Sequence, residues 1–125
     1  MNTTAPRTYL FVPGDRPERF DKALASGADA VVLDLEDAVA PADKPLARNA
    51  VALRLRDATP EDRARIVVRI NDESTADFAA DLALLAQNRA AHVMLPKAER
   101  PASVAAVRAA CPGIGVLGVR GAMEQ

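Results

Sequence analysis

Short apolar runs alternate along the chain with longer stretches in which apolar residues recur at helical spacing. Each run ends in a turn residue or a charged side chain, a pattern typical of buried strands. The predicted strands cover residues 8–12, 30–35, 65–70, 92–95 and 115–117. Strands that are apolar along their whole length, each followed by a helix, predict a parallel sheet with helices packed on it.

The stretches between these strands predict four helices. They cover residues 17–26, 44–56, a segment that begins at 74–77, and 102–110. The apolar residues of the second and third helices are predicted to face the sheet, because they recur at helical spacing. They are Leu46, Ala50, Val51 and Leu53 in the second helix and Phe78, Leu82 and Leu85 in the third.

These βα units place the chain in the α/β class and leave two architectures open. Eight such units fill a (β/α)8 TIM barrel of about 250 residues. With 125 residues, the chain holds four units and a fifth strand, and so forms at most one domain. Part of a TIM barrel and an open doubly wound sheet of five strands both fit this count, and periodicity does not choose between them.

Composition and charge argue against several kinds of partner. The formal net charge is −1, so the chain has no broad attraction to nucleic acid. No apolar run is long enough to span a membrane, and the N-terminus lacks the apolar core of a signal peptide. The single cysteine, Cys111, cannot form an internal disulfide, which agrees with a cytoplasmic location. We interpret Cys111 and the lone histidine, His92, as core residues.

Charged residues follow the predicted strands at the edge where ligands bind in parallel α/β folds, beyond the carboxyl ends. Arg69 ends the third strand, and its guanidinium is well shaped to hold a carboxylate through two parallel hydrogen bonds. A structural ion pair with Asp34 or Glu36 of the second strand explains Arg69 equally well. A charged residue beside an apolar strand needs a partner or a ligand in either case.

The other candidate residues lie at the same edge. Asp34 and Glu36 share one side of the second strand if that strand continues, and could hold Mg²⁺ or, as we favour, orient Arg69 and Lys97. Lys97, after the fourth strand, could offset the charge of an enolate or act as an ion-pair partner. Arg16, near the start of the first helix, could meet a phosphate or be solvated.

Four separated motifs of this sequence resemble one known family. They are residues 9–18, Tyr-Leu-Phe-Val-Pro-Gly-Asp-Arg-Pro-Glu; residues 28–41, which contain Leu-Asp-Leu-Glu-Asp-Ala-Val; residues 68–71, Val-Arg-Ile-Asn; and residues 94–99, Met-Leu-Pro-Lys-Ala-Glu. In order and spacing they look like the successive strand ends of the HpcH/HpaI aldolase/citrate lyase β-subunit superfamily. The resemblance extends from about residue 7 to residue 117.

The resemblance implies a TIM barrel that cleaves or forms a carbon–carbon bond in a short 3-hydroxyacyl thioester, such as citryl-, malyl- or citramalyl-CoA. The family uses Mg²⁺, which polarises an oxygen of the oxo or hydroxy acid. By resemblance, Arg69, Glu36 and Lys97 are the catalytic candidates, and Arg69, Arg16 and Asp34 are the substrate-binding ones. The implied partners are an acyl-CoA or acyl-carrier thioester and a 2-oxo acid, and the full-length family is expected to form homo-oligomers.

The resemblance stops near the C-terminus. The family's fifth strand carries a glutamate and its sixth an aspartate, and these two residues are the Mg²⁺ ligands. By register Gly121 takes the place of the glutamate, and no residue corresponds to the aspartate. We therefore expect Mg²⁺ as the family cofactor with no metal ligand in this chain, and we interpret residues 1–125 as the truncated N-terminal part of a single barrel lyase domain.

Two functions follow from this interpretation. In the first, the chain is a carbon–carbon lyase of the aldolase type that is weak or inactive alone. In the second, it is a non-catalytic remnant that binds or assembles with full-length lyase subunits.

Overall fold

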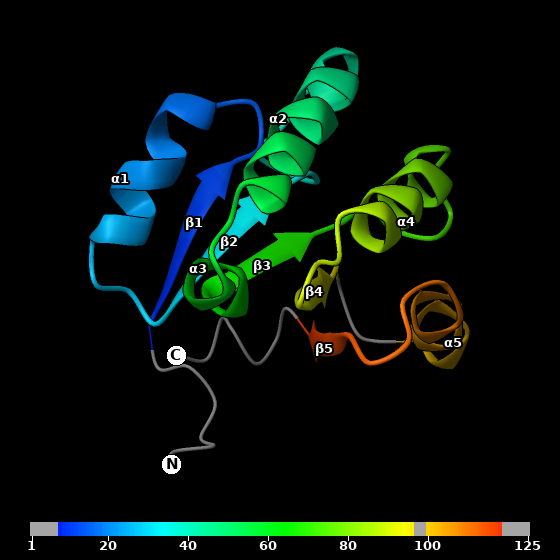
Figure 1. Cartoon of the computed structure of the whole chain (residues 1–125). Helices are drawn as coiled ribbons and strands as arrows, with labels where there is room; N and C mark the ends of the chain where they lie inside the picture. The colour runs from blue at the N-terminus through cyan, green and yellow to red at the C-terminus, as the bar shows by residue number, and fades with distance from the viewer. Residues whose placement is uncertain (1–7, 97–99, 119–125) are drawn as a thin grey trace.

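The computed structural model describes residues 8–96 and 100–118, and Lys97 lies outside these ranges. Figure 1 shows helices and strands in alternation along this part of the chain. The strands are β1 (Tyr9–Pro13), β2 (Ala30–Asp34), β3 (Ile66–Arg69), β4 (His92–Leu95) and β5 (Gly115–Gly118). The α-helices are α1 (Phe20–Ala25), α2 (Lys44–Arg56), α3 (Pro60–Arg65), α4 (Asp77–Gln87) and α5 (Pro101–Ala110). Two 3-10 turns, η1 (Pro17–Arg19) and η2 (Pro41–Asp43), precede α1 and α2.

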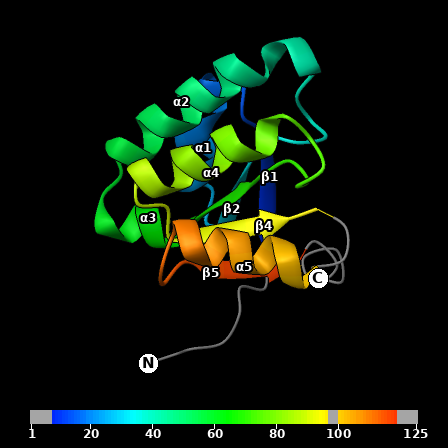
Figure 2. The ribbon, with the colours of Figure 1, turned by 90° about the vertical axis from the view of Figure 1, so that its right-hand side faces the viewer.

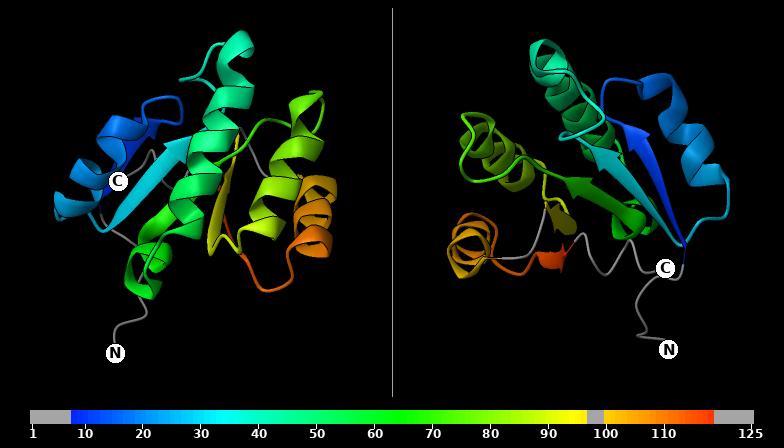
Figure 3. Two further views of the ribbon diagram at one scale, coloured as in Figure 1. Left: turned by 45° about the horizontal axis from the view of Figure 1, so that its top comes forward. Right: turned by 180° about the vertical axis from the view of Figure 1, so that it is seen from behind.

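The five strands form one parallel sheet in the order β1-β2-β3-β4-β5. Each strand therefore pairs with the next one along the chain. Figures 1 and 2 show the strands along an arc, with α1, α2, α4 and α5 on its outer side, and Figure 3 shows the same arrangement from two further directions. A doubly wound sheet would reverse its strand order and carry helices on both faces. The sequential order and one-sided cover decide between the two open architectures in favour of part of a TIM barrel.

The main core lies between the sheet and its helices. Alternate strand residues point into it, as the pleat requires. Its strand members include Val31, Leu33, Ile66, Val68, Val93 and Leu95. Its helix members include Phe20, Leu24, Ala47, Val51, Leu55, Leu84, Leu85 and Val107. Cys111 belongs to this core, as predicted, and burial raises the pKa of its thiol.

The opposite face of the sheet carries a second, smaller apolar cluster. Its buried members are Ala30, Val32, Val67 and Met94, with Tyr9 and Leu117 packed against them. In the described part of the chain, helices α1, α2, α4 and α5 all lie on the other face. His92 is half-buried at the amino end of β4, so it lies away from the carboxyl ends of the strands.

The predicted inner face of α2 is partly wrong. Leu46 and Leu53 are 66% and 52% exposed, whereas Ala47, Val51 and Leu55 are fully buried. These three residues are four apart and so form one stripe along the helix. The small side chain of Ala47 lets α2 approach the sheet closely, which leaves Leu46 on the solvent side.

The predicted face of α4 is closer to the structure. Leu85 is buried, and Phe78 and Leu82 are partly buried against the core. Asp81 is also fully buried on this helix, which the apolar spacing did not indicate.

Gly14 brings the ends of β1 and β2 together. Its N–H donates to the carbonyl oxygen of Asp34 over 2.8 Å. A Cβ at this position would lie 2.8 Å from the same oxygen and 3.2 Å from the Cβ of Ala47. The absence of a side chain therefore allows the close approach of the two strand ends.

Candidate functional site

The carboxyl ends of β2 and β3 bring Asp34 and Arg69 side by side. The two residues are register partners in the parallel ladder, so their side chains leave the sheet on the same face. Asp34 is only 2% exposed, and the side chain of Arg69 is 13% exposed. Two opposite charges are thus largely removed from water at the edge where ligands bind in barrels of this kind.

Asp34 holds Arg69 through a bidentate ion pair. Nε of Arg69 donates to Oδ1 of Asp34 over 3.0 Å, and Nη2 donates to Oδ2 over 2.6 Å. The same carboxylate accepts the backbone N–H groups of Glu36 (2.8 Å) and Ala38 (3.2 Å). Both carboxylate oxygens are therefore occupied, and the ion pair, chiefly its hydrogen bonds, raises the pKa of Arg69.

One edge of the Arg69 guanidinium is not occupied by any described residue. Asp34 takes the edge formed by Nε and Nη2, and no described residue accepts a hydrogen bond from Nη1. A guanidinium has five N–H donors, so the edge formed by Nη1 and Nη2 can still meet a carboxylate in a second bidentate contact. An ion pair with Asp34 was one of the two explanations considered for Arg69. It is present, and it still allows Arg69 to bind the carboxylate of a ligand.

The ring of Phe11 lies beneath the guanidinium of Arg69. Cζ of Arg69 is 5.4 Å from the centre of the ring, within the range of a cation–π contact. Phe11 is 37% exposed and is the middle residue of β1, which lies two strands from β3 in the sheet. The ring covers one face of the guanidinium, and sequence analysis did not single it out.

The residues around the carboxyl ends of β2 and β3, with Asp34 and Arg69 at their centre, form what we call the mouth. Glu36 also lies at this mouth, but beyond the end of β2. The strand ends at Asp34, so the condition under which the two acids would share one side of a continuing strand is not met. Oε1 of Glu36 is 3.7 Å from Nε of Arg69, and its side chain is 20% exposed. Burial and then the nearby Asp37 raise the pKa of Glu36, while Arg69 opposes this shift.

The structure does not bring Arg16 into this group. Arg16 is exposed after β1, at the position before η1, and no described hydrogen bond or ion pair joins its side chain to Asp34 or Arg69. Lys97 lies outside the described residues, so its prediction stays untested. The described candidates that meet are Asp34, Glu36 and Arg69.

The described residues do not form a Mg²⁺ site. Within residues 8–96 and 100–118 there is no group of three or more His, Cys, Asp or Glu side chains that could hold a metal ion. The oxygens of Asp34 are already engaged by Arg69 and by two N–H groups. A magnesium ion prefers six oxygen ligands. Apart from Asp34, the described carboxylates near Arg69 are those of Glu36 and its neighbour Asp37, which are too few for such a site.

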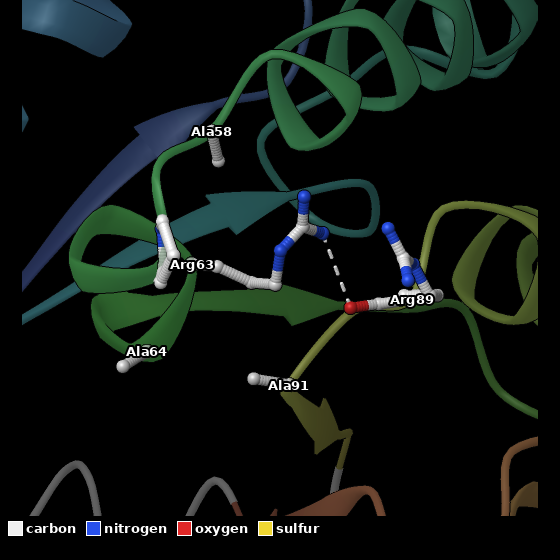
Figure 4. A pocket seen from close by; sticks show the side chains of 6 residues that line it. Ala58, Arg63, Ala64, Arg89 and Ala91 are labelled. Carbon is white, nitrogen blue, oxygen red and sulfur yellow. Dashed lines mark hydrogen bonds between the residues drawn. The ribbon is translucent and has the colours of Figure 1, made fainter.

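A separate hollow lies at the other end of the sheet, near the amino ends of β3 and β4. It measures about 470 Å³ and is lined by Ala58, Pro60, Arg63, Ala64, Arg89 and Ala91. Figure 4 shows Arg63 donating to the main-chain oxygen of Arg89. Arg63 also donates to Leu55 and Asn88, so it joins the ends of α2 and α4. We assign this hollow a structural role.

In the described part of the chain, no helix has the length and apolarity needed to cross a membrane.

A one-sided parallel sheet in sequential order, with an arginine–carboxylate pair at its carboxyl ends, matches the class of (β/α)8 barrel enzymes. The model of the HpcH/HpaI aldolase/citrate lyase family matches residues 7–123. The chain belongs to this family.

Two curated relatives agree with this assignment. The chain is 60% identical over 96 residues to the citrate lyase subunit beta-like protein of Mycobacterium tuberculosis, an alignment that covers 77% of this chain and 33% of the relative. It is 42% identical over 106 residues to the L-malyl-CoA/beta-methylmalyl-CoA lyase of Cereibacter sphaeroides, with 82% of this chain and 33% of the relative covered. The chain thus spans about a third of the length of these relatives.

A solved structure has the same fold. The crystal structure of the protein CitE of Mycobacterium tuberculosis, in complex with magnesium, acetoacetate and coenzyme A, superimposes with a TM-score of 0.73 at 48% identity. The match covers 95% of this chain and 43% of that chain. The βα units described above therefore correspond to part of a larger fold.

Proposed function

We propose that the chain contributes the substrate-carboxylate site of a carbon–carbon lyase that acts on a short 3-hydroxyacyl thioester, such as malyl-, citryl- or citramalyl-CoA. The observation that carries this proposal is the edge of Arg69 formed by Nη1 and Nη2, which no described residue occupies. Asp34 fixes one edge of the guanidinium, and Phe11 supports its face. The remaining edge has the shape that binds the carboxylate of a 2-oxo acid.

The reaction breaks the bond between C2 and C3 of the acyl group. The hydroxyl group on C3 loses its proton and becomes the carbonyl of a 2-oxo acid, while the bonding electrons pass to C2 as an enolate of the thioester. Protonation of C2 then gives the shorter acyl thioester. Arg69 would hold the acid through its carboxylate, with Glu36 beside it and Lys97 and Arg16 as further candidates for contact with the enolate and the thioester.

Magnesium would supply a Lewis acid for the oxygen of the acid, as its presence in the CitE complex supports. Because the described residues do not hold the ion, we assign its ligands to a part of the domain beyond them. We likewise assign residues 1–125 to the N-terminal part of one barrel domain, since the chain covers 33% of each curated relative. The chain alone is then expected to be weak or inactive.

The test compares the chain with a completed barrel. Residues 1–118 would be fused to the segment of the Mycobacterium tuberculosis relative that follows the aligned region. Both proteins would be assayed with Mg²⁺ against the three thioesters, following glyoxylate from malyl-CoA, oxaloacetate from citryl-CoA and pyruvate from citramalyl-CoA. We expect turnover by the fusion and little or none by the chain alone.

Substitution of Arg69 tests whether its guanidinium binds the carboxylate of the substrate. Arg69→Ala in the fusion should lower kcat/KM by about 100-fold or more, because a charge-assisted bidentate contact is lost. Arg56→Ala, at an exposed arginine of α2, is the matched control and should leave kcat/KM unchanged. An Arg69→Ala fusion with undiminished kcat/KM would remove Arg69 from the site, and thioester hydrolysis without carbon–carbon cleavage would contradict the lyase assignment.

The outer edges of the sheet in the described part of the chain favour the second candidate function, assembly with full-length lyase subunits. Both outer strands, β1 and β5, pair on one side only in the described part of the chain, and unpaired strand edges invite pairing with another chain. Mixing the chain with the full-length Mycobacterium tuberculosis relative, without Mg²⁺, and measuring the mass in solution tests this candidate. A mixed complex supports it, and separate masses at micromolar concentration contradict it.

A further inference from the structure

Lys44, the first residue of α2, is buried behind the mouth. It is 8% exposed. Its Nζ donates to the carbonyl oxygens of Leu35 (2.9 Å) and Glu36 (2.8 Å), the two residues that follow Asp34 at the end of β2. The ammonium therefore lies against the main chain of the segment that carries the site acids.

This position is unfavourable for a lysine on general grounds. Removing an ammonium from water costs free energy unless its N–H groups are hydrogen-bonded. A positive charge in the first turn of a helix also opposes the helix dipole. Residues that break local preferences in this way are expected where a side chain has a specific task. The two bonds to Leu35 and Glu36 indicate what that task is.

Lys44 acts where the strand ladder stops. The N–H of Leu35 still donates to the carbonyl oxygen of Arg69 over 2.8 Å. The N–H of Asn71, which would continue the ladder to the carbonyl of Leu35, donates instead to the buried carboxylate of Asp81. The carbonyl of Leu35 is taken by the side-chain amide of Asn71 (3.0 Å) and by Lys44. Side chains thus replace the main-chain ladder at this point.

The main chain of Glu36 is fixed from both sides. Its N–H donates to Asp34, and its carbonyl oxygen accepts from Lys44. The direction in which the Glu36 side chain leaves the chain, toward Arg69, follows from these two contacts. The same turn presents the N–H of Ala38 to Asp34.

We propose that Lys44 is a positioning residue, which holds the turn after β2 so that Asp34 and Glu36 face Arg69. Its effect on ligand binding rests on the proposed carboxylate site, whereas its effect on the turn does not. Lys44→Met keeps the apolar stem and removes the charge. The carbonyl of Leu35 then keeps Asn71 and that of Glu36 keeps the N–H of Val39 at 3.3 Å, so the chain is expected to fold.

The first measurement needs no ligand. Amide hydrogen exchange of the chain, followed by NMR, measures how well the N–H groups of Glu36 and Ala38 are protected. Both groups donate hydrogen bonds to the carboxylate of Asp34. Lys44→Met should speed their exchange by about tenfold while the amides of α5 keep their rates, because the opening is local. Lys44→Arg, which retains a buried cation with several donors, should restore most of the protection. Lys22→Met, at an exposed lysine of α1, is the control and should change neither group of amides.

The outcomes separate a local role from a global one. Unchanged exchange at Glu36 and Ala38 in Lys44→Met would overturn the proposal, and so would equal acceleration at all amides. If Lys44→Met does not fold, Lys44→Gln, which removes the charge and keeps an amide NH2 group as a donor, is measured in its place. The same local acceleration is expected, and the same results would overturn the proposal.

The second measurement uses the fusion described above and a 2-oxo acid. Lys44→Met should weaken glyoxylate binding by about tenfold and raise KM more than it lowers kcat, and Lys44→Arg should recover affinity. Val107→Ala, which removes buried volume on α5, supplies a comparable loss of stability far from the mouth. Equal affinity of Lys44→Met and Val107→Ala would overturn the role of Lys44 in binding. If the unsubstituted fusion binds no oxo acid, the proposed function fails, and the exchange experiment still decides the role of Lys44 in the turn.

Discussion

At the scale of single residues, the mouth depends on mutual compensation of buried charges. Neither Asp34 nor Arg69 would be stable at its position alone, because an unpaired charge out of water is costly. Two N–H groups add to the carboxylate's hydrogen bonds, and the ring of Phe11 adds to the guanidinium's contacts. Substitutions that keep the shape of these side chains and remove one charge are therefore informative.

Asp34→Asn should destabilise the chain by about 2 kcal/mol, since it leaves Arg69 without its anion and turns one oxygen acceptor into a donor that faces other donors. Urea unfolding at neutral pH measures this loss. Glu18→Gln, at an exposed acid of η1 away from the ion pair, is the control and should change stability by less than about 0.5 kcal/mol. Equal stabilities of the two variants would contradict the central place given to the ion pair.

Glu36 makes a prediction about pH. Its pKa is raised in the folded chain by burial and by Asp37, so the ionised form is disfavoured relative to the unfolded chain. Its contribution to stability is fully present below the ordinary glutamate pKa of about 4.3 and is lost as pH rises through the raised value. Glu36→Gln should therefore be more stable than the unsubstituted chain at neutral pH, and this advantage should vanish in acid.

Urea unfolding at several pH values measures that advantage. Glu18→Gln, at an exposed acid of η1, removes the same charge and should show no such pH-dependent gain. A Glu36→Gln chain that is less stable than its parent at neutral pH would mean that the attraction of Arg69 outweighs burial.

At the scale of elements, the sequence predicted the strands well and the helix faces less well. Each predicted strand overlaps an observed one, because runs of apolar residues closed by turns leave few alternatives. The inner face of α2 was predicted in part: Val51 is buried and Ala50 packs against the core, whereas the packing uses Ala47 and leaves Leu46 exposed. Helix α3 was missed, although Thr59 before Pro60 and an acidic first turn form a recognisable start, with Thr59 accepting the N–H of Asp62.

The predicted site was recovered in part for a similar reason. Asp34, Glu36 and Arg69 could be proposed because charged residues at strand ends are conspicuous in the sequence. Phe11, Lys44 and Asn71 were not assigned their roles, because each depends on a contact with a different element. An aromatic ring under a guanidinium, or a lysine bonded to two carbonyls, leaves no local pattern that the spacing of residues reveals.

At the end of α4, we predict a substitution that raises the stability of the chain. Arg89 has a φ of 51°, and the N–H of Ala90 closes the helix end on the carbonyl of Leu85. Glycine is the usual residue in this left-handed position. Arg89→Gly should therefore raise stability by about 0.5–1 kcal/mol, since the contact of Arg63 is with the main-chain oxygen and survives.

Thermal unfolding measures this gain as a rise in Tm of a few degrees. Arg56→Gly, at the last residue of α2, is the control and should lower stability, because glycine weakens an ordinary helical position. A lower Tm for Arg89→Gly would show that the guanidinium contributes more than the backbone strain costs.

At the scale of the whole molecule, the described residues form no metal site, and this predicts how the stability of the chain responds to Mg²⁺. Mg²⁺ at low millimolar concentration should raise the Tm of the chain no more than an inert salt of equal ionic strength, because only binding to the folded state stabilises it. The fusion with the remaining part of the relative should show a Mg²⁺-dependent rise. A specific rise in the chain alone would show that it builds a metal site.

The order of the strands also bears on how the chain acquires its structure during synthesis. Each strand finds its partner in the unit just before it, so no early strand waits for a distant one. Contacts close along the sequence form quickly because little loop entropy is lost, and growing chains fold from the N-terminus. The ion pair of Asp34 and Arg69 joins the second and third strands, so this corner of the mouth can be assembled on the ribosome before the rest of the sheet has been made.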